Sequence, residues 1–536
     1  MCANGWMSGS VLREAWGWQG VIESDCGALS NIATQHHYAA DKLHAAAASM
    51  VGTVDVECDS VYSSSLQAAY DGGLVALAQL RAAATRILAH QFALGLFDDP
   101  HGSRWYTDPA MSDAATVHSA AHARLAREAA QQGVVLVQNP GGLLPLSGGG
   151  GSRKKLALVG PLGNITDVFL GDYRPAACPG PAQKAPAGTA CLPTLLQLLQ
   201  ERAGGNTAVG YAPGCTDGPG CAQLDLGAAN ATMAAADIIV LALGEKVTDN
   251  DSGGNTGGEG KDRSTVGLPG QQAQLVSAAL ATGKPVVALL LSGGAVSVDA
   301  LSSPAGEARA AVLYPGFGGE SGQNALVDVL FGDAEASGRL TWTVVPESWG
   351  DATPMGDMSM QAGGQGGRSY KYFNGSALFE FGAGLSYTTF QLAMIPTAGP
   401  VALSPRSTSV CVESTNVGSR ASPVVVTAFA SADRADLESP PRILPLRKLV
   451  GWQKSLTEPN AGSAHLCFDL SDTDVAFVDD AGAHIAYAGS YTLTFFDGAT
   501  KVSVGAFVAA RRVISTLPPP DNPQPPCCSS SVRTCC

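Results

Sequence analysis

The pattern of hydrophobic and polar positions changes three times along the chain. In residues 1–98, two short β-branched runs, GVIESD (20–25) and TVDVEC (53–58), are separated by an alanine-rich stretch that predicts a helix. A second helix is predicted at roughly 74–97, just before LFDDPHGS. This alternation is typical of βα units, although two units alone do not make a domain.

The pattern is fuller between about residue 115 and residue 346. SAAHARLAREAAQQG predicts a helix, and strands are predicted for GVVLVQ, KLALVG, DIIVLALG and KPVVALLLSGG. Near-continuous apolar strands that alternate with helices indicate a mostly parallel sheet covered on both faces. After about residue 397, short alternating strands replace the helices and predict an antiparallel β-sandwich. The Pro-rich and Cys-rich end, 516–536, is not expected to fold.

Composition narrows the class of protein. The 536 residues should form about three domains, and 45% hydrophobic with 15% charged residues indicates a folded chain. The formal net charge of -14 argues against a nucleic-acid partner, which would need a basic face. No apolar run approaches the ~20 residues of a membrane span, so no membrane partner is expected.

Cysteines and glycosylation sequons indicate the secretory route. The chain has 13 cysteines and carries Asn-x-Ser/Thr sequons at Asn164, Asn230, Asn250 and Asn374. Met1 is not followed by a basic and then an apolar region, so the sequence as written has no export signal. The combination leads us to expect that the true N-terminus lies upstream.

Asp25 is the first candidate for chemistry. It follows a predicted buried strand and precedes Cys26 and Gly27, where the chain can turn. Catalytic groups of parallel α/β enzymes gather at this carboxyl end of the strands. The residues alone leave two interpretations open for Asp25: a catalyst, or a helix N-cap or loop residue.

The surrounding motifs resemble glycoside hydrolase family 3, particularly its plant-type β-xylosidases and α-L-arabinofuranosidases. The segment around Asp25 shares Trp-x-x-x-Gly, Ser-Asp-Cys and Thr-Gln-His-Tyr with that subgroup, the last interrupted here by one extra His. The resemblance continues through TVDVEC, LGLFDDP, AREAAQQGVVLVQNPGGLLPLS, EGKDRSTVGLPGQQAQLV, VLFGDAEASGRLTWT and FEFGAGLSYTTF, in the family's order.

The resemblance implies two catalytic carboxyl groups. Asp25 would be the nucleophile of a retaining glycosidase, with an acid/base carboxyl about 5 Å away. The best match for the acid/base is Glu259, in GGEGKDR within a Gly-rich stretch, while Glu245 and Glu320 remain rivals. Asp262 and Arg263 are expected to hold this stretch by an ion pair.

The resemblance also implies a multidomain fold. We expect the last two units of a (β/α)8 barrel at 1–98, a linker and helix at 99–132, an α/β sandwich domain at 133–346, a connecting segment at 347–396 and a fibronectin type III-like β-sandwich at 397–515. About six barrel strands would be missing. The subgroup's further Asp after Ser-Asp-Cys is Gly27 here, which weakens any inference about the substrate. Cys26 and Cys58 could form a disulfide or remain free thiols.

Two functions of different class follow. The first is an exo-acting retaining glycosidase that releases β-D-xylose or α-L-arabinose from xylan-type oligosaccharides, outside the cell or in the cell wall. The second is a catalytically inactive remnant that binds carbohydrate or serves as a scaffold. Neither implies a metal ion or another cofactor, and the sequence leaves the oligomeric state open.

Overall fold

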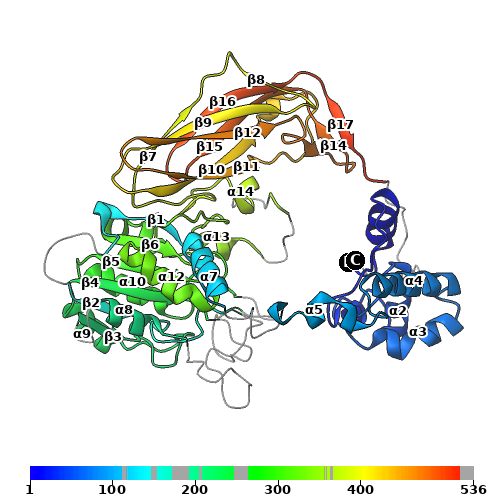
Figure 1. The fold of residues 1–536 in the computed structure, drawn as a ribbon, viewed down its shortest axis with the longest axis horizontal. Coiled ribbons are helices and arrows are strands. Elements are labelled where there is room, and N and C mark those ends of the chain that lie inside the picture. Colours follow the sequence, from blue (N-terminus) through cyan, green and yellow to red (C-terminus); the bar gives the residue numbers. More distant parts are fainter. Residues whose placement is uncertain are drawn as a thin grey trace. The chain divides into compact units, whose positions relative to one another are not determined.

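The chain folds into two compact units (Figure 1). The first comprises Met1–Val117 with two short later stretches, Val478–His484 and Val513–Cys536; the second comprises His118–Phe477 and Ile485–Arg512. The computed structural model describes residues 1–111, 116, 119–146, 154–171, 192–203, 208–246, 257, 263–354, 357, 359–361 and 366–518.

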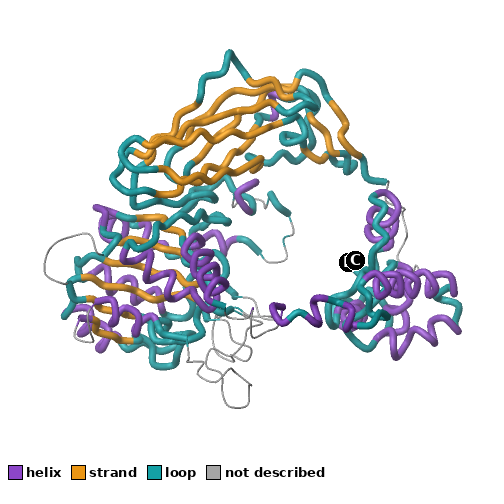
Figure 2. The backbone as a smooth tube through the Cα atoms, viewed as in Figure 1, coloured by secondary structure: helices purple, strands orange, loops and turns teal. Residues whose placement is uncertain are grey.

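The first unit is mainly helical (Figure 2). Both predicted helices are present, the alanine-rich one beginning after Asp41, whose side chain accepts a hydrogen bond from the backbone N–H of His44 and caps it. Small and branched side chains of α1, α2 and α3 pack into one core cluster. The helices are η1 (Trp6–Ala15), α1 (Ala28–Thr34), α2 (Lys42–Val51), α3 (Val61–Asp71), α4 (Leu77–Ala93), η2 (Pro100–Gly102), α5 (Arg104–Thr107) and η3 (Pro109–Met111).

The two strands predicted in this unit are shorter than expected. GVIESD and TVDVEC meet in a single parallel bridge, Glu23 with Val56. Two backbone hydrogen bonds flank it, from Ser24 N to Val56 O (2.9 Å) and from Asp55 N to Ile22 O (2.8 Å). Because sheets gain stability from three or more strands, this isolated pair does not extend into a regular ladder among the described residues.

A six-stranded sheet forms the centre of the second unit's α/β part, in the order β1-β6-β5-β4-β2-β3. β1 runs antiparallel to β6 and the other neighbours are parallel. The four predicted strands are confirmed, and β3 and β6 join them. The strands are β1 (Val135–Gln138), β2 (Leu156–Val159), β3 (Val209–Ala212), β4 (Ile238–Gly244), β5 (Val286–Leu291) and β6 (Ala310–Tyr314).

Helices cover both faces of this sheet, as the near-continuous apolar strands predict. Ile239, Leu241 and Leu243 of β4 share one core cluster with α9 (Leu226–Ala234) and α10 (Gln272–Ala281). Alternate residues of the same strand share the opposite cluster with α8 (Leu195–Ala203) and α12 (Gly322–Phe331). Further helices are α7 (Ala120–Gly133), η4 (Pro140–Gly142), η6 (Asp299–Ser302), α11 (Pro304–Arg309), η7 (Gly319–Ser321), α13 (Glu347–Ala352) and α14 (Ser369–Tyr372).

The later strands form two main sheets, in the orders β11-β10-β15-β16-β8 and β12-β9-β7. Their pairings are antiparallel except for that of β16 with β8. Cys411 and Cys467 lie opposite each other on β9 and β12 and are joined by a disulfide. The strands are β7 (Phe390–Met394), β8 (Val401–Leu403), β9 (Thr408–Asn416), β10 (Ser422–Ser431), β11 (Lys448–Thr457), β12 (Gly462–Leu470), β13 (Phe477–Val478), β14 (His484–Ala486), β15 (Gly489–Phe496), β16 (Lys501–Val508) and β17 (Arg512–Ser515).

Candidate functional site

Asp25 lies at the carboxyl end of the paired segments, where the chain turns into α1. Its carboxylate is exposed, and Oδ1 accepts a hydrogen bond from the backbone N–H of Cys26 (2.8 Å). Gly27 adopts φ +76°, a left-handed conformation that glycine tolerates best, and its N–H donates to Cys58 O (3.1 Å). The turn therefore presents the Asp25 carboxylate to solvent while the backbone on both sides of it is held.

Cys26 and Cys58 form a disulfide, which decides between the two states left open by the sequence. Their Cα atoms are 4.3 Å apart, and the bond joins positions 32 residues apart in the chain. It lies beside the bridge between Glu23 and Val56. The disulfide thus fastens the residue after Asp25 to the neighbouring segment.

A buried ionic cluster, which the sequence did not predict, holds the segment that leads to this turn. The Asp55 carboxylate is fully buried and accepts hydrogen bonds from Arg13 Nη2 (2.7 Å), Arg86 Nη2 (2.6 Å) and the backbone N–H of Ile22 (3.0 Å). Burial lowers the pKa of Arg13 and the charge of Arg86 adds to this, whereas Asp55 opposes it. The sequence contains one sign of this cluster. Asp55 stands between two valines in a run whose pattern otherwise predicts a buried strand.

The strand order of the α/β sheet in the second unit reverses at one point. From β2 the chain goes to β3 on one side, and later to β4 on the other side, so the strand order reverses between β2 and β4. Ligands of open α/β sheets bind outside the carboxyl ends of the strands at such a reversal. An ion pair crosses this position, from Lys246 Nζ after β4 to Asp167 Oδ1 after β2 (3.2 Å).

The three candidates for the acid/base role are Glu245, Glu259 and Glu320, and the structure describes two of them. Glu245 follows β4 directly and is 6% exposed, with Oε1 bound by Arg263 Nε (2.9 Å) and by the hydroxyl of Ser292 (2.9 Å). Glu320 is exposed in η7, which follows β6. Glu259 and Asp262 lie outside the described residues.

Two of these observations bear on the predicted roles. The Glu245 side chain is largely buried and its Oε1 is bound by Arg263 and Ser292, so this oxygen is poorly placed to protonate a sugar oxygen. Arg263, which was expected to pair with Asp262, pairs with Glu245 in the described part of the chain. Asp25 belongs to the first unit, whereas Glu245 and Glu320 belong to the second.

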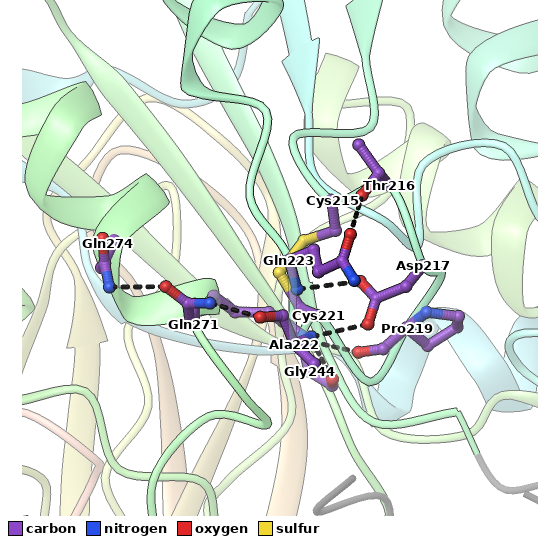
Figure 3. The surroundings of a disulfide bond; sticks show 11 residues. Cys215, Thr216, Asp217, Pro219, Cys221, Ala222, Gln223, Gly244, Gln271 and Gln274 are labelled. Atoms are coloured by element: carbon purple, nitrogen blue, oxygen red, sulfur yellow. Dashed lines mark hydrogen bonds between the residues drawn. A yellow bond between two sulfur atoms is a disulfide. The ribbon is translucent and has the colours of Figure 1, made fainter. Parts of the chain in front are cut away.

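A second disulfide lies near the end of β4 (Figure 3). Cys215 and Cys221 close a short loop, and the Asp217 carboxylate inside it accepts hydrogen bonds from the backbone N–H groups of Ala222 (2.9 Å) and Gln223 (3.1 Å).

Among the described residues, no group of three or more His, Cys, Asp or Glu side chains could hold a metal ion. None of the helices described is long and apolar enough to cross a membrane.

Comparison with known proteins gives this arrangement a family. Residues 134–387 match the glycosyl hydrolase family 3 C-terminal domain. The chain is 31% identical over 513 residues to a probable exo-1,4-β-xylosidase of Aspergillus flavus, covering 92% of this chain and 61% of the relative. It is 32% identical over 400 residues to a β-xylosidase/α-L-arabinofuranosidase of Medicago sativa subsp. varia, covering 74% of this chain and 47% of the relative.

Solved structures of similar proteins support the same family. A family 3 exo-β-xylosidase, determined in complex with a xylobiose aziridine activity-based probe, superposes on this chain with a TM-score of 0.81 at 25% identity. The aligned part covers 97% of this chain and 65% of the xylosidase chain. A β-glucosidase from Erythrobacter marinus superposes with a TM-score of 0.74 at 28% identity, covering 95% of this chain and 66% of its own. The chain spans 61% of the length of the Aspergillus flavus relative. These findings show that the chain belongs to glycoside hydrolase family 3.

Proposed function

We propose that the protein is a retaining exo-glycoside hydrolase that releases β-D-xylose or α-L-arabinose from xylan-type oligosaccharides. The observation that carries the proposal is the Asp25 turn, where an exposed carboxylate sits at the carboxyl end of a parallel pair and is fixed by the Cys26–Cys58 disulfide. The relatives named as exo-β-xylosidases support the reaction class.

In this proposal Asp25 is the nucleophile and Glu259 the acid/base. The Asp25 carboxylate attacks the anomeric carbon as Glu259 protonates the departing oxygen, which gives a covalent glycosyl-enzyme. Glu259 then takes a proton from water, which hydrolyses the intermediate and restores both groups. A held backbone around Asp25 favours this step, because misplacing a reacting group by about 1 Å can cost a factor of about 100 in rate.

The fold assignments that accompany this function are also proposals. The segments 20–25 and 53–58 with their helices would be the last two units of a (β/α)8 barrel, within 1–98. The strands in 397–515 would form a fibronectin type III-like domain, and 133–346 the α/β sandwich domain. The bridge between Glu23 and Val56 supports the first assignment because barrel strands are parallel.

The proposed location is extracellular or in the cell wall. Three disulfides, Cys26–Cys58, Cys215–Cys221 and Cys411–Cys467, support it because such bonds persist in oxidising compartments. The choice between xylose and arabinose rests on the relatives, whose names include both activities.

The test is the turnover of aryl β-xyloside and aryl α-arabinofuranoside by the native protein and by Asp25→Asn. We expect kcat of Asp25→Asn to be at least about 1,000-fold lower, because the amide of Asn is a much weaker nucleophile than the carboxylate of Asp. Glu23→Gln is the matched control, since Glu23 is also exposed and lies two residues away, and it should keep its activity.

Normal turnover by Asp25→Asn would overturn the proposal. Saturable binding of xylo-oligosaccharides by the native protein, without hydrolysis of either glycoside, would instead favour a carbohydrate-binding or scaffold module.

A further inference from the structure

Asn374 lies in an exposed segment two residues after α14, within one of the glycosylation sequons of the chain. The sequon is Asn374-Gly375-Ser376, and all three residues are exposed. The backbone N–H of Asn374 donates to Gly366 O (2.7 Å), whereas its side-chain amide has no hydrogen-bond partner among the described residues. The backbone here is therefore held, while the amide nitrogen that would accept a glycan is accessible.

The other two sequons that the structure describes have different surroundings. Asn230 is in the middle of α9 and lines a cavity of about 430 Å³ together with alanines of α9 and α10. Asn164 is exposed and follows β2. Of all the sequons in the sequence, only that of Asn374 has an aromatic residue two positions before the asparagine, which is Tyr372.

Tyr372 and Asn374 line the same cavity, whose volume is about 380 Å³. Leu444 and Leu446, which precede β11, also line it, and Leu446 is 49% exposed. One face of a pyranose ring consists of C–H groups, so it can cover aromatic and aliphatic side chains while its hydroxyl groups stay in water. The cavity therefore has the size and the apolar side chains to hold the first sugar of a glycan on Asn374.

Hydrogen bonds between α14 and the β11 region hold the sides of this cavity together (Figure 1). Leu446 N donates to Lys371 O (2.7 Å), and Leu449 N donates to the hydroxyl of Tyr370 (3.2 Å). The Tyr370 ring also stacks on that of Phe381, with centroids 4.2 Å apart. A site that is already ordered loses less conformational entropy when it binds a group.

We propose that Asn374 is N-glycosylated and that the first N-acetylglucosamine of its glycan packs in this cavity against Tyr372 and Leu446. This rests on the proposed function only through the extracellular or cell-wall location, because N-glycans belong to the secretory route. The co-substrate is an oligosaccharide linked to a lipid diphosphate. Asn374 Nδ2 forms a bond to the sugar C1 and gives a proton to the transferase, while the bond from C1 to the phosphate oxygen breaks and the lipid diphosphate leaves.

Peptide mass spectrometry of the native protein tests the attachment. Enzymatic deglycosylation in heavy-oxygen water should convert Asn374 to a labelled Asp, on the tryptic peptide of residues 372–406, which contains no other sequon. Ser376→Ala should remove the glycan and Ser376→Thr should keep it, because Ser or Thr completes the sequon. Asn230→Gln, which changes a sequon elsewhere in the same unit, is the matched control and should leave the glycan on Asn374.

The same full chain, secreted from yeast behind an added export signal, supplies the variants and separates two failures. An unmodified Asn374 in the yeast protein, beside a glycan on another sequon, would overturn this proposal and leave the proposed location standing. N-glycans missing from every sequon of the native protein, with Asn374 modified in yeast, would instead overturn the proposed location. Neither result concerns the reaction assigned to Asp25.

Thermal melting tests the packing of the first sugar. Trimming the glycan to its first N-acetylglucosamine should leave the melting temperature unchanged, whereas Ser376→Ala should lower it by about 1–2 °C. In a Tyr372→Ala background the same loss of the glycan should lower it by less than about 0.5 °C, and Tyr372→Phe should behave like the wild type because the ring remains. Equal decreases in both backgrounds, or a full decrease on trimming, would overturn the packing against Tyr372.

Discussion

Individual side chains of the first unit hold the backbone next to Asp25, the residue that we propose as the nucleophile. Asp25 is exposed, whereas Asp55, on the neighbouring segment, is buried among Arg13, Arg86 and the backbone of Ile22. A fully buried carboxylate between two guanidinium groups is stabilising only while its partners remain. Asp55 therefore determines the local structure on which the proposed role of Asp25 depends.

Replacing Asp55 by Asn leaves two guanidinium groups with no opposing charge in a buried place. We expect the free energy of unfolding of the first unit to fall by about 3–5 kcal/mol, measured by urea denaturation. Asp99→Asn is the control, because Asp99 is exposed and its partner among the described residues is the nearby His101. Equal urea midpoints for wild type and Asp55→Asn would show that the cluster carries no stability.

The sequence predicted some of these residues and missed others for a physical reason. Asp25, Cys26 and Gly27 are adjacent, so a strand end, a carboxylate and a turn residue could be recognised together. Arg13, Asp55 and Arg86 are far apart in the chain and meet only through the fold. The pairing of Cys26 with Cys58 stayed open because it depends on the distance between two segments, which no spacing in the sequence reports.

Secondary-structure elements followed the hydrophobic pattern where burial was complete. β4 and β5 are apolar throughout and buried on both faces, and their sequences predicted them correctly. The GVIESD run carries the same β-branched signal, but it has a single short partner and forms only a bridge. The hydrophobic pattern indicates which structure a segment prefers. A regular strand also needs neighbouring strands to pair with.

A pH-dependent ion-pair contact lies at Glu380, in the connection that precedes β7. Glu380 Oε2 lies 2.6 Å from Lys501 Nζ on β16 and 3.4 Å from Arg447 Nη1, just before β11. Burial raises the pKa of Glu380, but Lys501 and Arg447 outweigh it and bring the pKa below its ordinary value. Because the folded state favours the ionised form, its stabilising contribution is present above the unfolded pKa and disappears as the pH falls through the folded pKa.

Glu380→Gln should therefore lower the melting temperature by about 1–2 °C at pH 7 and by nearly nothing at pH 3. Scanning calorimetry of the wild type and the variant at both pH values measures this difference. The same decrease at both pH values would mean that the side chain acts through packing and not through its charge.

In the whole molecule, the α/β part and the β-sandwich of the second unit are joined through a buried cation. Arg339 donates to Gly338 O (2.9 Å) on the α/β side and to Asp497 O (2.7 Å) after β15. Burial lowers the pKa of Arg339 to about 10, and Asp497 opposes the shift. These carbonyl groups would lose their partner if the guanidinium were removed.

Arg339→Met should weaken the attachment between these two parts by roughly 1–3 kcal/mol. Scanning calorimetry should then resolve a separate transition for the sandwich at a lower temperature than in the wild type. Arg309→Met, a change at an exposed position on α11, serves as the control. A variant that melts with the wild-type profile would contradict the role given to Arg339.

Trapping the covalent intermediate tests most directly whether Asp25 is the nucleophile. The native protein would be treated with a fluorinated xylosyl or arabinosyl substrate, which forms a slowly hydrolysed glycosyl-enzyme. It would then be reduced to open the Cys26–Cys58 disulfide and digested with trypsin. We expect one added sugar on the peptide of residues 14–42, located by fragmentation at Asp25 and absent from Asp25→Asn. A label on another carboxylate, or hydrolysis with no trapped sugar, would contradict it.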